Sequence, residues 1–274
     1  NRLVEKAFIE SLGINVAPYT AIRSMEGIDA IADSFQFPAI IKAASFGYDG
    51  KGQAVCQTAD DVRAAFSALN EVECVLEQRI NLEREISTVL ARSQSGDITN
   101  FPVAENVHVN GILHSTTVPS SVPEAQAQKA IEMADTIADG LGYVGTMAVE
   151  FFISKEGDIL ANEIAPRPHN SGHFTLDACE TSQFEQQVRM LCGLPSGNCE
   201  LTSPVVMMNL LGDVWGSSQP HWETLLSQPQ NKLHLYGKKE ARPGRKMGHF
   251  NVLAETVEQA TEIALQTFAD LQAD

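Results

Sequence analysis

The sequence predicts an α+β protein of three parts: two blocks that mix helices with strands, followed by a small lobe. Three observations support this fold class. Strand-like apolar runs alternate with amphipathic helical segments, and glycine, asparagine and proline separate them. The segment Leu194-Pro195-Ser196-Gly197-Asn198 has the composition of a boundary. We therefore expect a first subdomain in residues 1–72, a second in 73–195 and a C-terminal lobe in 196–274.

The first block alternates between helix and strand. Helices are expected in residues 3–12, 27–35 and 58–69, and strands in residues 37–44 and 53–57. Gly13 ends the first helix. Thr58 has the character of an N-cap, and Asp60 and Asp61 suit the first helical turn because its free N–H groups favour negative charge.

The second block begins with strands and continues with a long helix. Strands are expected in residues 74–78, 84–91, 101–108 and 111–118, and helices in residues 123–141 and 182–192. Asn110-Gly111 is a strong hairpin signal between two of these strands, and Gly142 ends the long helix. In the lobe we expect a strand in residues 205–212, a basic loop in 242–249 and a final helix in 256–271.

Composition excludes several classes of protein. The net charge of −16 argues against a general binder of nucleic acid or anionic membranes. The five cysteines form no CxxC pair, which fits reduced thiols in the cytoplasm. No stretch has the ~20 apolar residues of a membrane span, and no signal peptide opens the chain. Because the chain starts at Asn1 without an initiator Met, we expect it to be a fragment of a longer protein.

A predicted hairpin places two glutamates opposite each other. Apolar runs in residues 148–154 and 158–164 flank a turn at 156–157, and pairing across it joins residues whose numbers sum to 313. Glu150 then lies opposite Glu163, with Cβ atoms about 4.5–5.5 Å apart. Two carboxylates this close among apolar residues favour a divalent cation or a shared proton. The alternatives are a solvated strand edge or a register that separates the two side chains.

A glycine-rich loop follows the strand that contains Lys42. The loop Gly47-Tyr48-Asp49-Gly50-Lys51-Gly52 connects two strands, whereas Walker and Rossmann loops precede a helix. Its glycines let backbone N–H groups approach phosphate oxygens, and Lys51 adds positive charge. Lys42 shares a strand face with Ile40 and Ala44, so its ammonium lies near the base of the loop. The alternatives are glycines that serve only the turn and a lysine that extends harmlessly to solvent.

Three further segments carry polar side chains. Glu77-Gln78-Arg79-Ile80, with Glu85 after it, can bind ribose hydroxyls and an adenine edge, although taken alone it fits a solvated turn better. Donors gather after Glu163 in Arg167-Pro168-His169-Asn170-Ser171-Gly172-His173, which indicates contact with an anion or substrate. The basic segment Arg242-Pro243-Gly244-Arg245-Lys246-Met247-Gly248-His249 favours a phosphate or carboxylate ligand.

Together these segments resemble the ATP-grasp superfamily and, within it, the N5-carboxyaminoimidazole ribonucleotide synthetase family. The string Asn162-Glu163-Ile164-Ala165-Pro166-Arg167-Pro168-His169-Asn170-Ser171-Gly172-His173 is highly specific to this group. The other matching segments are the glycine-rich loop with Gln53, residues 77–80, Glu105-Asn106-Val107-His108, Ser182-Gln183-Phe184-Glu185 and the basic segment. The resemblance spans nearly the whole chain in order. It implies an ATP-grasp fold of two α/β subdomains plus a small C-terminal lobe.

The resemblance also implies the roles of individual residues. ATP would be bound by Arg2, Lys42, Gly47, Tyr48, Asp49, Gly50, Lys51, Gly52, Gln53, Glu77, Gln78, Arg79, Ile80, Glu85, His108, Asn162 and Glu163. Magnesium would be held by Glu150 and Glu163. Substrate would be bound by Tyr48, Asn170, Ser171, Arg242, Arg245 and Lys246. The catalytic residues would be Asp49, Lys51, His169 and Lys246.

The implied reaction is the ATP-dependent carboxylation of 5-aminoimidazole ribonucleotide with bicarbonate, through carboxyphosphate, in purine biosynthesis. Family members are often homodimers and work in the cytoplasm, so we expect both here. The chain departs from the family in two ways: it lacks the preceding small domain, and Ala43-Ala44-Ser45 lacks an expected Arg and Thr. We therefore expect this fragment to bind nucleotide and to carboxylate poorly.

Two other functions agree with parts of the pattern. Another ATP-grasp carboxylate–amine ligase or a formate-dependent transformylase would share the fold without the His-Asn-Ser-Gly-His string. An inactive nucleotide-binding module would bind ATP without turnover. The joint presence of Glu150, Glu163, Lys42 and Lys51 disfavours such a module, since loss of phosphate or metal ligands is the first expected sign of decay.

Overall fold

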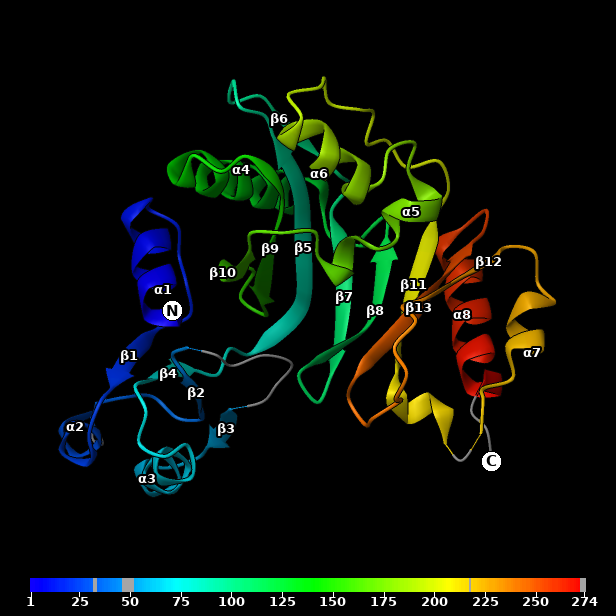
Figure 1. Cartoon of the computed structure of the whole chain (residues 1–274). Helices are drawn as coiled ribbons and strands as arrows, with labels where there is room; N and C mark the ends of the chain where they lie inside the picture. Colours follow the sequence, from blue (N-terminus) through cyan, green and yellow to red (C-terminus); the bar gives the residue numbers. More distant parts are fainter. Residues whose placement is uncertain (32–33, 46–51, 217, 272–274) are drawn as a thin grey trace. The chain divides into compact units, whose positions relative to one another are not determined.

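The computed structural model describes residues 1–31, 34–45, 52–216 and 218–271 (Figure 1). They form two compact units, which are described separately below. Unit 1 consists of residues 1–83 and 151–163, and unit 2 consists of residues 84–150 and 164–274. The predicted division into three parts stays a prediction.

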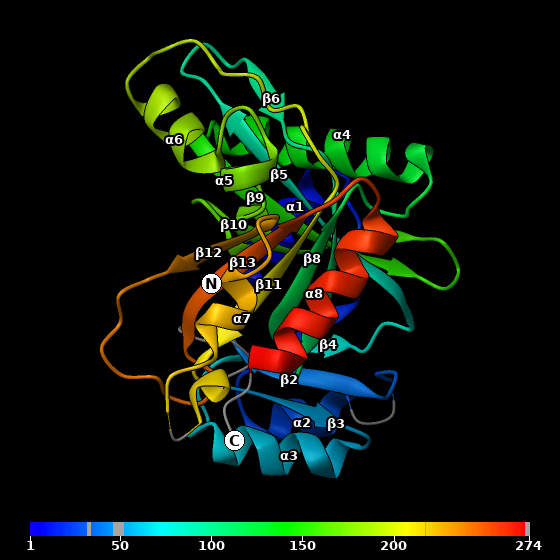
Figure 2. The same cartoon turned by 90° about the vertical axis from the view of Figure 1, so that its right-hand side faces the viewer.

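Unit 1 contains a four-stranded antiparallel sheet with helices beside it. The strand order is β1 (Tyr19–Ile22), β4 (Cys74–Gln78), β2 (Ala39–Ala43) and β3 (Gln53–Cys56). The helices are α1 (Arg2–Ser11), α2 (Met25–Ile31) and α3 (Ala59–Ala68). Figure 2 shows α3 close to strands β2 and β3, whereas α2 contacts β1 and α3. Ile28, Phe66, Ile41 and Leu76 meet in a fully buried core that fixes the helices to the sheet.

The N-terminus of α3 is capped by the residues that the sequence predicts. The Thr58 side chain accepts a hydrogen bond from the Asp61 N–H, and the Asp61 carboxylate accepts one from the Thr58 N–H. This capping box satisfies two N–H groups that the helix itself leaves without partners. The expected N-cap at Thr58 is therefore confirmed.

The second sheet has nine strands, in the order β10-β9-β5-β7-β8-β11-β13-β12, and β6 pairs with β5. The strand bounds are β5 Leu82–Arg92, β6 Ile98–Asn100, β7 Ala104–Val109, β8 Ile112–Val118, β9 Gly145–Ser154, β10 Ile159–Ala165, β11 Val205–Leu211, β12 Asn231–Leu235 and β13 Lys246–Leu253. The longer helices are α4 (Glu124–Leu141), α6 (Gln183–Leu191) and α8 (Val257–Leu271). The short ones are α5 (Thr175–Ala178), α7 (Trp222–Leu226), and the 3₁₀ turns η1 (Asn170–Gly172) and η2 (Gly212–Trp215).

Helix α8 covers the C-terminal strands of unit 2. Figures 1 and 2 show it alongside β11 and β13. Ala260, Ala264 and Leu271 on the helix pack with Met208 and Phe250 on these strands, and all five side chains are fully buried. Small residues on the buried face of the helix let it lie close to the sheet.

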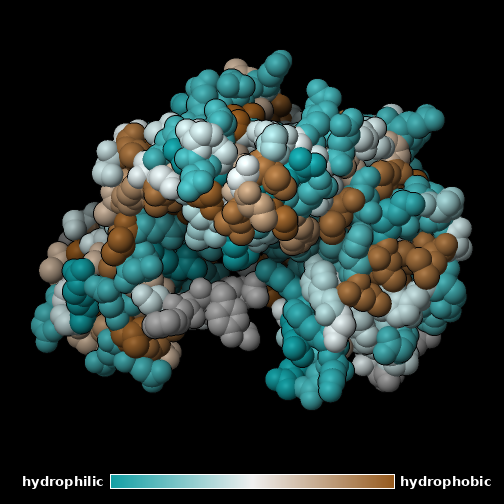
Figure 3. Space-filling view, turned by 45° about the horizontal axis from the view of Figure 1, so that its top comes forward, coloured by the Kyte–Doolittle hydropathy of each residue, from teal (hydrophilic) through white to brown (hydrophobic). Residues whose placement is uncertain are grey.

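Helix α6 has an unusual distribution of side chains. Its glutamines Gln183 and Gln186 are buried, whereas Phe184, Val188 and Leu191 are exposed. Figure 3 shows hydrophobic groups in separate clusters on a largely hydrophilic face of the molecule. Across the described parts of the chain, the helices are too short or too polar to span a bilayer.

The expected helices and most of the expected strands are present, with three corrections. The segment of residues 242–249 is not all loop, because Lys246 begins strand β13. The strand expected from residue 101 begins at Ala104. Strands β1, β6 and β12 and helices α5 and α7 were not expected.

The predicted register of the glutamate hairpin is also wrong at its turn. The Ser154 N–H donates to the Asp158 C=O at 2.9 Å, and the Gly157 N–H donates to the Ser154 C=O. The first pair therefore has numbers that sum to 312, one less than expected. The pairing of Glu150 with Glu163 and their assignment to a metal ion stay predictions.

Candidate functional site

Unit 1 brings together a buried carboxylate and two lysines. Lys42 lies on β2 and Glu77 on the neighbouring strand β4. The Lys42 Nζ donates to Glu77 Oε2 at 2.7 Å, and the Lys6 Nζ lies 3.3 Å from Glu77 Oε1. The side chains of Lys6 and Glu77 are 3% and 4% exposed. Lys6 extends to this site from α1, where sequence alone suggested nothing beyond an ordinary helical lysine.

Electrostatics within this cluster follow from burial and pairing. Burial lowers the pKa of Lys6, against the opposing attraction of Glu77. For Glu77, burial alone would raise the pKa, but Lys42 and Lys6 outweigh it and hold the pKa below its ordinary value. The carboxylate is thus charged and fully engaged with two ammonium groups. Because both of its oxygens already contact ammonium groups, the predicted contact of Glu77 with a ribose stays a prediction.

Arg2 and Glu163, each predicted to bind ATP, form an ion pair within unit 1. The Arg2 guanidinium lies 3.2 Å from Glu163 Oε2, and the Glu163 side chain is 41% exposed. The Arg2 N–H also donates to the Ala44 C=O at 2.8 Å, which ties the start of α1 to the end of β2. A carboxylate this exposed retains oxygen lone pairs for another ligand.

Residues 78–80, which are predicted to contact the adenine base, line a cavity of about 650 Å³. Gln78, Arg79 and Ile80 form part of its wall, together with the segment from Gly13 to Pro18 and the turn near Ser154. Backbone bonds hold this strand end, since the Gln78 N–H donates to the Pro18 C=O and the Arg79 N–H to the Pro38 C=O. The cavity has room for a purine base.

The glycine-rich loop is described only at its end. Gly47, Tyr48, Asp49, Gly50 and Lys51 lie outside the described residues. Gln53 pairs with Lys42 across β2 and β3, so the loop connects antiparallel strands as expected. Gly52 has a φ of +73°, a backbone conformation that glycine adopts without strain.

In unit 2, two of the residues predicted to bind ATP form a pair. His108 Nδ1 on β7 lies 2.6 Å from Glu85 Oε2 on β5. Burial alone would lower the pKa of His108, but Glu85 outweighs burial and raises it above the ordinary value. The pair can therefore hold a proton near neutral pH. Beside it, Asn106 is buried and bonded to Ser87 and Thr116.

The predicted substrate loop after β10 is held by one buried glutamine. The His169 N–H donates to Gln183 Oε1 at 2.9 Å, and Gln183 Nε2 donates to the His169 C=O at 2.7 Å. Gln183 Nε2 also lies 3.0 Å from His173 Nδ1. A Cβ on Gly172 would lie 2.6 Å from Gln183 Oε1, so only glycine fits there. Gln183 therefore fixes the backbone that carries His169 and Asn170.

The ring of His169 is neutral and oriented. Burial, helped by Arg167 and Lys246, lowers its pKa to about 3. Nδ1 accepts from the Ser171 N–H at 3.4 Å and contacts the Ser171 hydroxyl at 2.9 Å. The ring proton is therefore on Nε2, which lies 3.7 Å from Glu150 Oε1. A neutral imidazole in this tautomer presents an N–H donor toward the Glu150 carboxylate.

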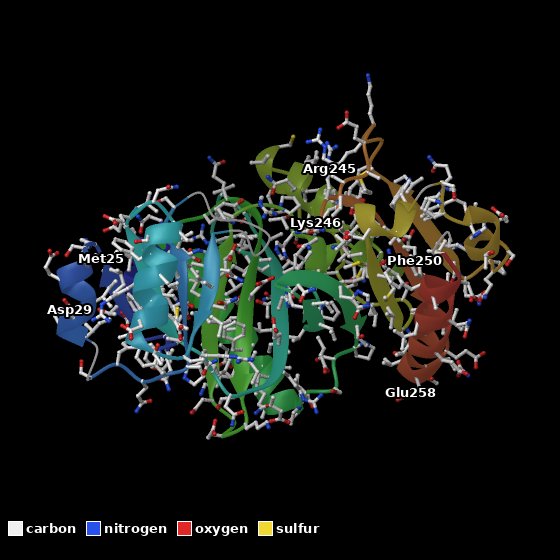
Figure 4. The ribbon with its side chains drawn as sticks, turned by 90° about the horizontal axis from the view of Figure 1, so that it is seen from below. Met25, Asp29, Arg245, Lys246, Phe250 and Glu258 are labelled. Carbon is white, nitrogen blue, oxygen red and sulfur yellow. The ribbon has the colours of Figure 1, made fainter. Side chains whose placement is uncertain are left out.

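The basic segment lies beside the strands β11 and β13. Figure 4 shows Arg245 and Lys246 at the start of β13, with Phe250 farther along it. The Gly244 N–H donates to Asp213 Oδ2 at 2.7 Å, and the Arg245 C=O accepts from the Gly212 N–H. Arg242 is 71% exposed and paired with Glu240. The segment is thus an ordered turn that leads into β13, and Arg242 lies at its surface.

A column of stacked rings joins the substrate loop to β13. The ring centroids of His173 and His249 are 4.6 Å apart, and those of His249 and His234 are also 4.6 Å apart. His234 Nε2 contacts Asp177 Oδ2 at 2.8 Å, and the Tyr236 hydroxyl contacts His249 Nδ1. Burial lowers the pKa of His173 to about 4 and that of His249 to about 2, so both rings are neutral.

This column brings the two predicted substrate segments together within unit 2. His169 and Asn170 precede His173 in one segment, and Lys246 precedes His249 in the other. Sequence reasoning missed Lys6, Gln183 and this column. The quoted segments contain Gln183, His173 and His249, but nothing in their spacing indicates which partners they contact. Among the described residues, no group of three or more His, Cys, Asp or Glu side chains is arranged so that it could hold a metal ion.

Comparisons with known proteins agree with these segments. Residues 7–184 match the model of the ATP-grasp domain, and residues 205–263 match that of the phosphoribosylaminoimidazole carboxylase C-terminal domain. The N5-carboxyaminoimidazole ribonucleotide synthase of Bacillus subtilis is 43% identical over 255 residues. The match covers 93% of this chain and 66% of that relative, so the chain spans about two thirds of its length.

Solved structures give the same picture. The N5-carboxyaminoimidazole synthetase of Staphylococcus aureus complexed with ADP has a TM-score of 0.90 at 37% identity, covering 98% of this chain and 71% of that one. The N5-carboxyaminoimidazole synthase of Aspergillus clavatus, in complex with ADP and 5-aminoimidazole ribonucleotide, has a TM-score of 0.89 at 28% identity. That match covers 99% of this chain and 72% of the other.

Proposed function

Because this chain belongs to the ATP-grasp family of N5-carboxyaminoimidazole ribonucleotide synthases, we propose that it serves the ATP-dependent carboxylation of 5-aminoimidazole ribonucleotide by bicarbonate. The observation that carries this proposal is the 43% identity to a synthase of that name over 93% of the chain. The local geometry supports it, since the segment most specific to the family contains the buried His169, which Gln183 and Ser171 hold in place.

In this proposal, unit 1 binds the nucleotide. Lys42, held by Glu77, neutralises phosphate charge, and the wall formed by Gln78, Arg79 and Ile80 holds the adenine. The loop that contains Asp49 and Lys51 completes the site. Positioning and charge neutralisation are the main contributions that a protein makes to phosphoryl transfer.

Magnesium fits the chemistry of the proposed donors. Glu163 offers a carboxylate that is 41% exposed, and Glu150 offers a second one. Oxygen ligands of this kind are those that magnesium prefers. When bound, magnesium would neutralise the charge on the transferring phosphoryl group. Arg2, which pairs with Glu163, would orient that carboxylate.

Unit 2 binds the carboxyl donor and acceptor. His169 Nε2–H and Asn170 orient bicarbonate, whose oxygen attacks the γ-phosphorus of ATP to give carboxyphosphate and ADP. The exocyclic amine of the ribonucleotide then attacks the carboxyl carbon, and phosphate leaves. Lys246, Arg245 and Arg242 hold the anionic ribonucleotide. A buried, neutral His169 can donate a hydrogen bond without adding net positive charge.

A direct test is the release of ADP by the purified protein with magnesium and ATP. Under the proposal, ADP release rises when 5-aminoimidazole ribonucleotide and bicarbonate are both present. Formate in place of bicarbonate should give no increase, which separates this function from a formate-dependent transformylase. ATP binding without any turnover would instead favour an inactive module and count against the proposal.

Two further properties belong to the same proposal. Homodimerisation and a cytoplasmic location both stay predictions from the family resemblance and composition. Sedimentation of the purified protein, at concentrations from about 1 to 100 μM, would measure its oligomeric state directly. A monomer over the whole range would contradict the expected homodimer.

A further inference from the structure

The cluster of Lys6, Glu77 and Lys42 has one feature that nucleotide binding by Lys42 does not explain. Lys6 is 2% exposed, yet its ammonium makes no hydrogen bond of good geometry. Its nearest carboxylate is Glu77 at 3.3 Å, which makes its shorter contact, 2.7 Å, to Lys42. Burial of an ammonium group costs free energy of folding when its one carboxylate contact is long and shared, so the presence of Lys6 at this position needs an explanation.

The net charge of the Lys6, Lys42 and Glu77 cluster offers an explanation. Two ammonium groups and one carboxylate leave a surplus of one positive charge inside unit 1. The other groups around Lys6 are the Tyr19 ring, with its centroid 5.6 Å from Nζ, and the Glu5 carboxylate, whose attraction is weaker than that of Glu77. The surplus charge is complementary to a polyphosphate.

The two lysines differ in access. The Lys42 side chain is 12% exposed, whereas that of Lys6 is 3% exposed. Only Lys42 can therefore reach a ligand outside the cluster. Lys6 can act on that ligand solely through Glu77 and through its own charge.

We propose that Lys6 is a positioning residue: by sharing the Glu77 carboxylate, it prevents Glu77 from neutralising Lys42 and so keeps Lys42 available to the phosphates of the nucleotide. Without Lys6, the carboxylate and Lys42 form a neutral pair, and the attraction for phosphate falls. This inference rests on the proposed function, since it assumes that the ligand of Lys42 is a nucleotide.

The test measures how four variants of the full chain bind tripolyphosphate and ATP by calorimetry. Tripolyphosphate has no ribose or base, so it reports the phosphate site alone. Lys6→Met sets the cluster charge to zero, Glu77→Gln raises it to plus two, and the double variant Lys6→Met/Glu77→Gln restores plus one. Lys129→Met, which removes one charge from the exposed face of α4, controls for net charge.

We expect Lys6→Met to bind tripolyphosphate and ATP about tenfold more weakly, because a unit charge a few ångströms away acts through a low effective dielectric. The double variant should bind tripolyphosphate within about threefold of wild type, and Lys129→Met should match wild type. Glu77→Gln should bind tripolyphosphate at least as tightly as wild type. If Lys6 served only to stabilise the fold, the additional replacement Glu77→Gln would not restore tripolyphosphate binding.

Several results would overturn the inference. One is a Lys6→Met variant with an unchanged melting curve and wild-type affinity for tripolyphosphate. If Lys6→Met does not fold, Glu77→Gln decides, since weaker tripolyphosphate binding there contradicts the shared-carboxylate argument. If wild type binds neither ATP nor tripolyphosphate, the proposed function fails together with this inference, whereas wild-type binding with no effect of Lys6→Met refutes only the latter.

Discussion

Replacing Gln183 by leucine should damage both stability and catalysis, and its neighbour Gln186 offers a matched control. Both glutamines lie fully buried on α6, and each bonds to the N–H and C=O of one loop residue. For Gln183 that residue is His169, whereas for Gln186 it is Gly197. The two substitutions therefore remove similar bonds from different loops.

The expected cost follows from the groups left without partners. Gln183→Leu leaves the buried N–H and C=O of His169 unpaired, at about 1–3 kcal/mol each, so the free energy of unfolding should fall by about 2–6 kcal/mol. Gln186→Leu should cost a similar amount. Urea unfolding, followed by circular dichroism, compares the two variants with wild type.

Catalysis should separate the two variants. Gln183→Leu releases the backbone that holds His169 and Asn170, so carboxylation should fall about 100-fold at a temperature where both variants are folded. Gln186→Leu should retain activity within about threefold of wild type, because Gly197 lies outside the proposed site. Equal losses of activity in the two variants would refute the argument that Gln183 positions the substrate loop.

The remaining predictions concern charge and pH. Glu163→Gln should abolish magnesium-dependent ATP hydrolysis while leaving the melting temperature nearly unchanged, because its exposed pair with Arg2 contributes under about 1 kcal/mol; retained activity with a large loss of stability would contradict the metal assignment. Lys246→Ala should raise the KM for the ribonucleotide far more than the Kd for ATP, and equal changes would count against its assignment to substrate. Stability should fall as pH drops from about 6.5 toward 4, because unfolded histidines bind protons that buried His173 and His249 exclude; His249→Asn should reduce that slope, and urea unfolding at several pH values measures it.

The fold was predicted best where local signals are strong. The glycine end of α4, the N-cap at Thr58 and the Asn110-Gly111 turn each act over a few residues, so the chain alone reveals them. Strand β12, Asn231–Leu235, was missed because its polar residues give no apolar run. It is a strand because it pairs with β13, a contact that local sequence does not encode.

In the candidate site, too, local features were predicted and long-range contacts were missed. Resemblance indicated which segments matter, and composition indicated which side chains carry charge. Neither could show that Lys6 is buried against Glu77, or that His173 stacks on His249, because those contacts join segments far apart in the chain. The error in the hairpin register has a related cause, since one extra residue in a turn shifts every pair after it.

Incorporation of isotope-labelled bicarbonate shows directly whether this protein uses ATP to fix bicarbonate on 5-aminoimidazole ribonucleotide. The measurement follows labelled bicarbonate into the ribonucleotide during turnover by the intact protein with ATP and magnesium. We expect label in the carboxylated product in proportion to the ADP released, and none when ATP is omitted or His169 is replaced by alanine. ADP release that depends on the ribonucleotide but leaves the product unlabelled would contradict it.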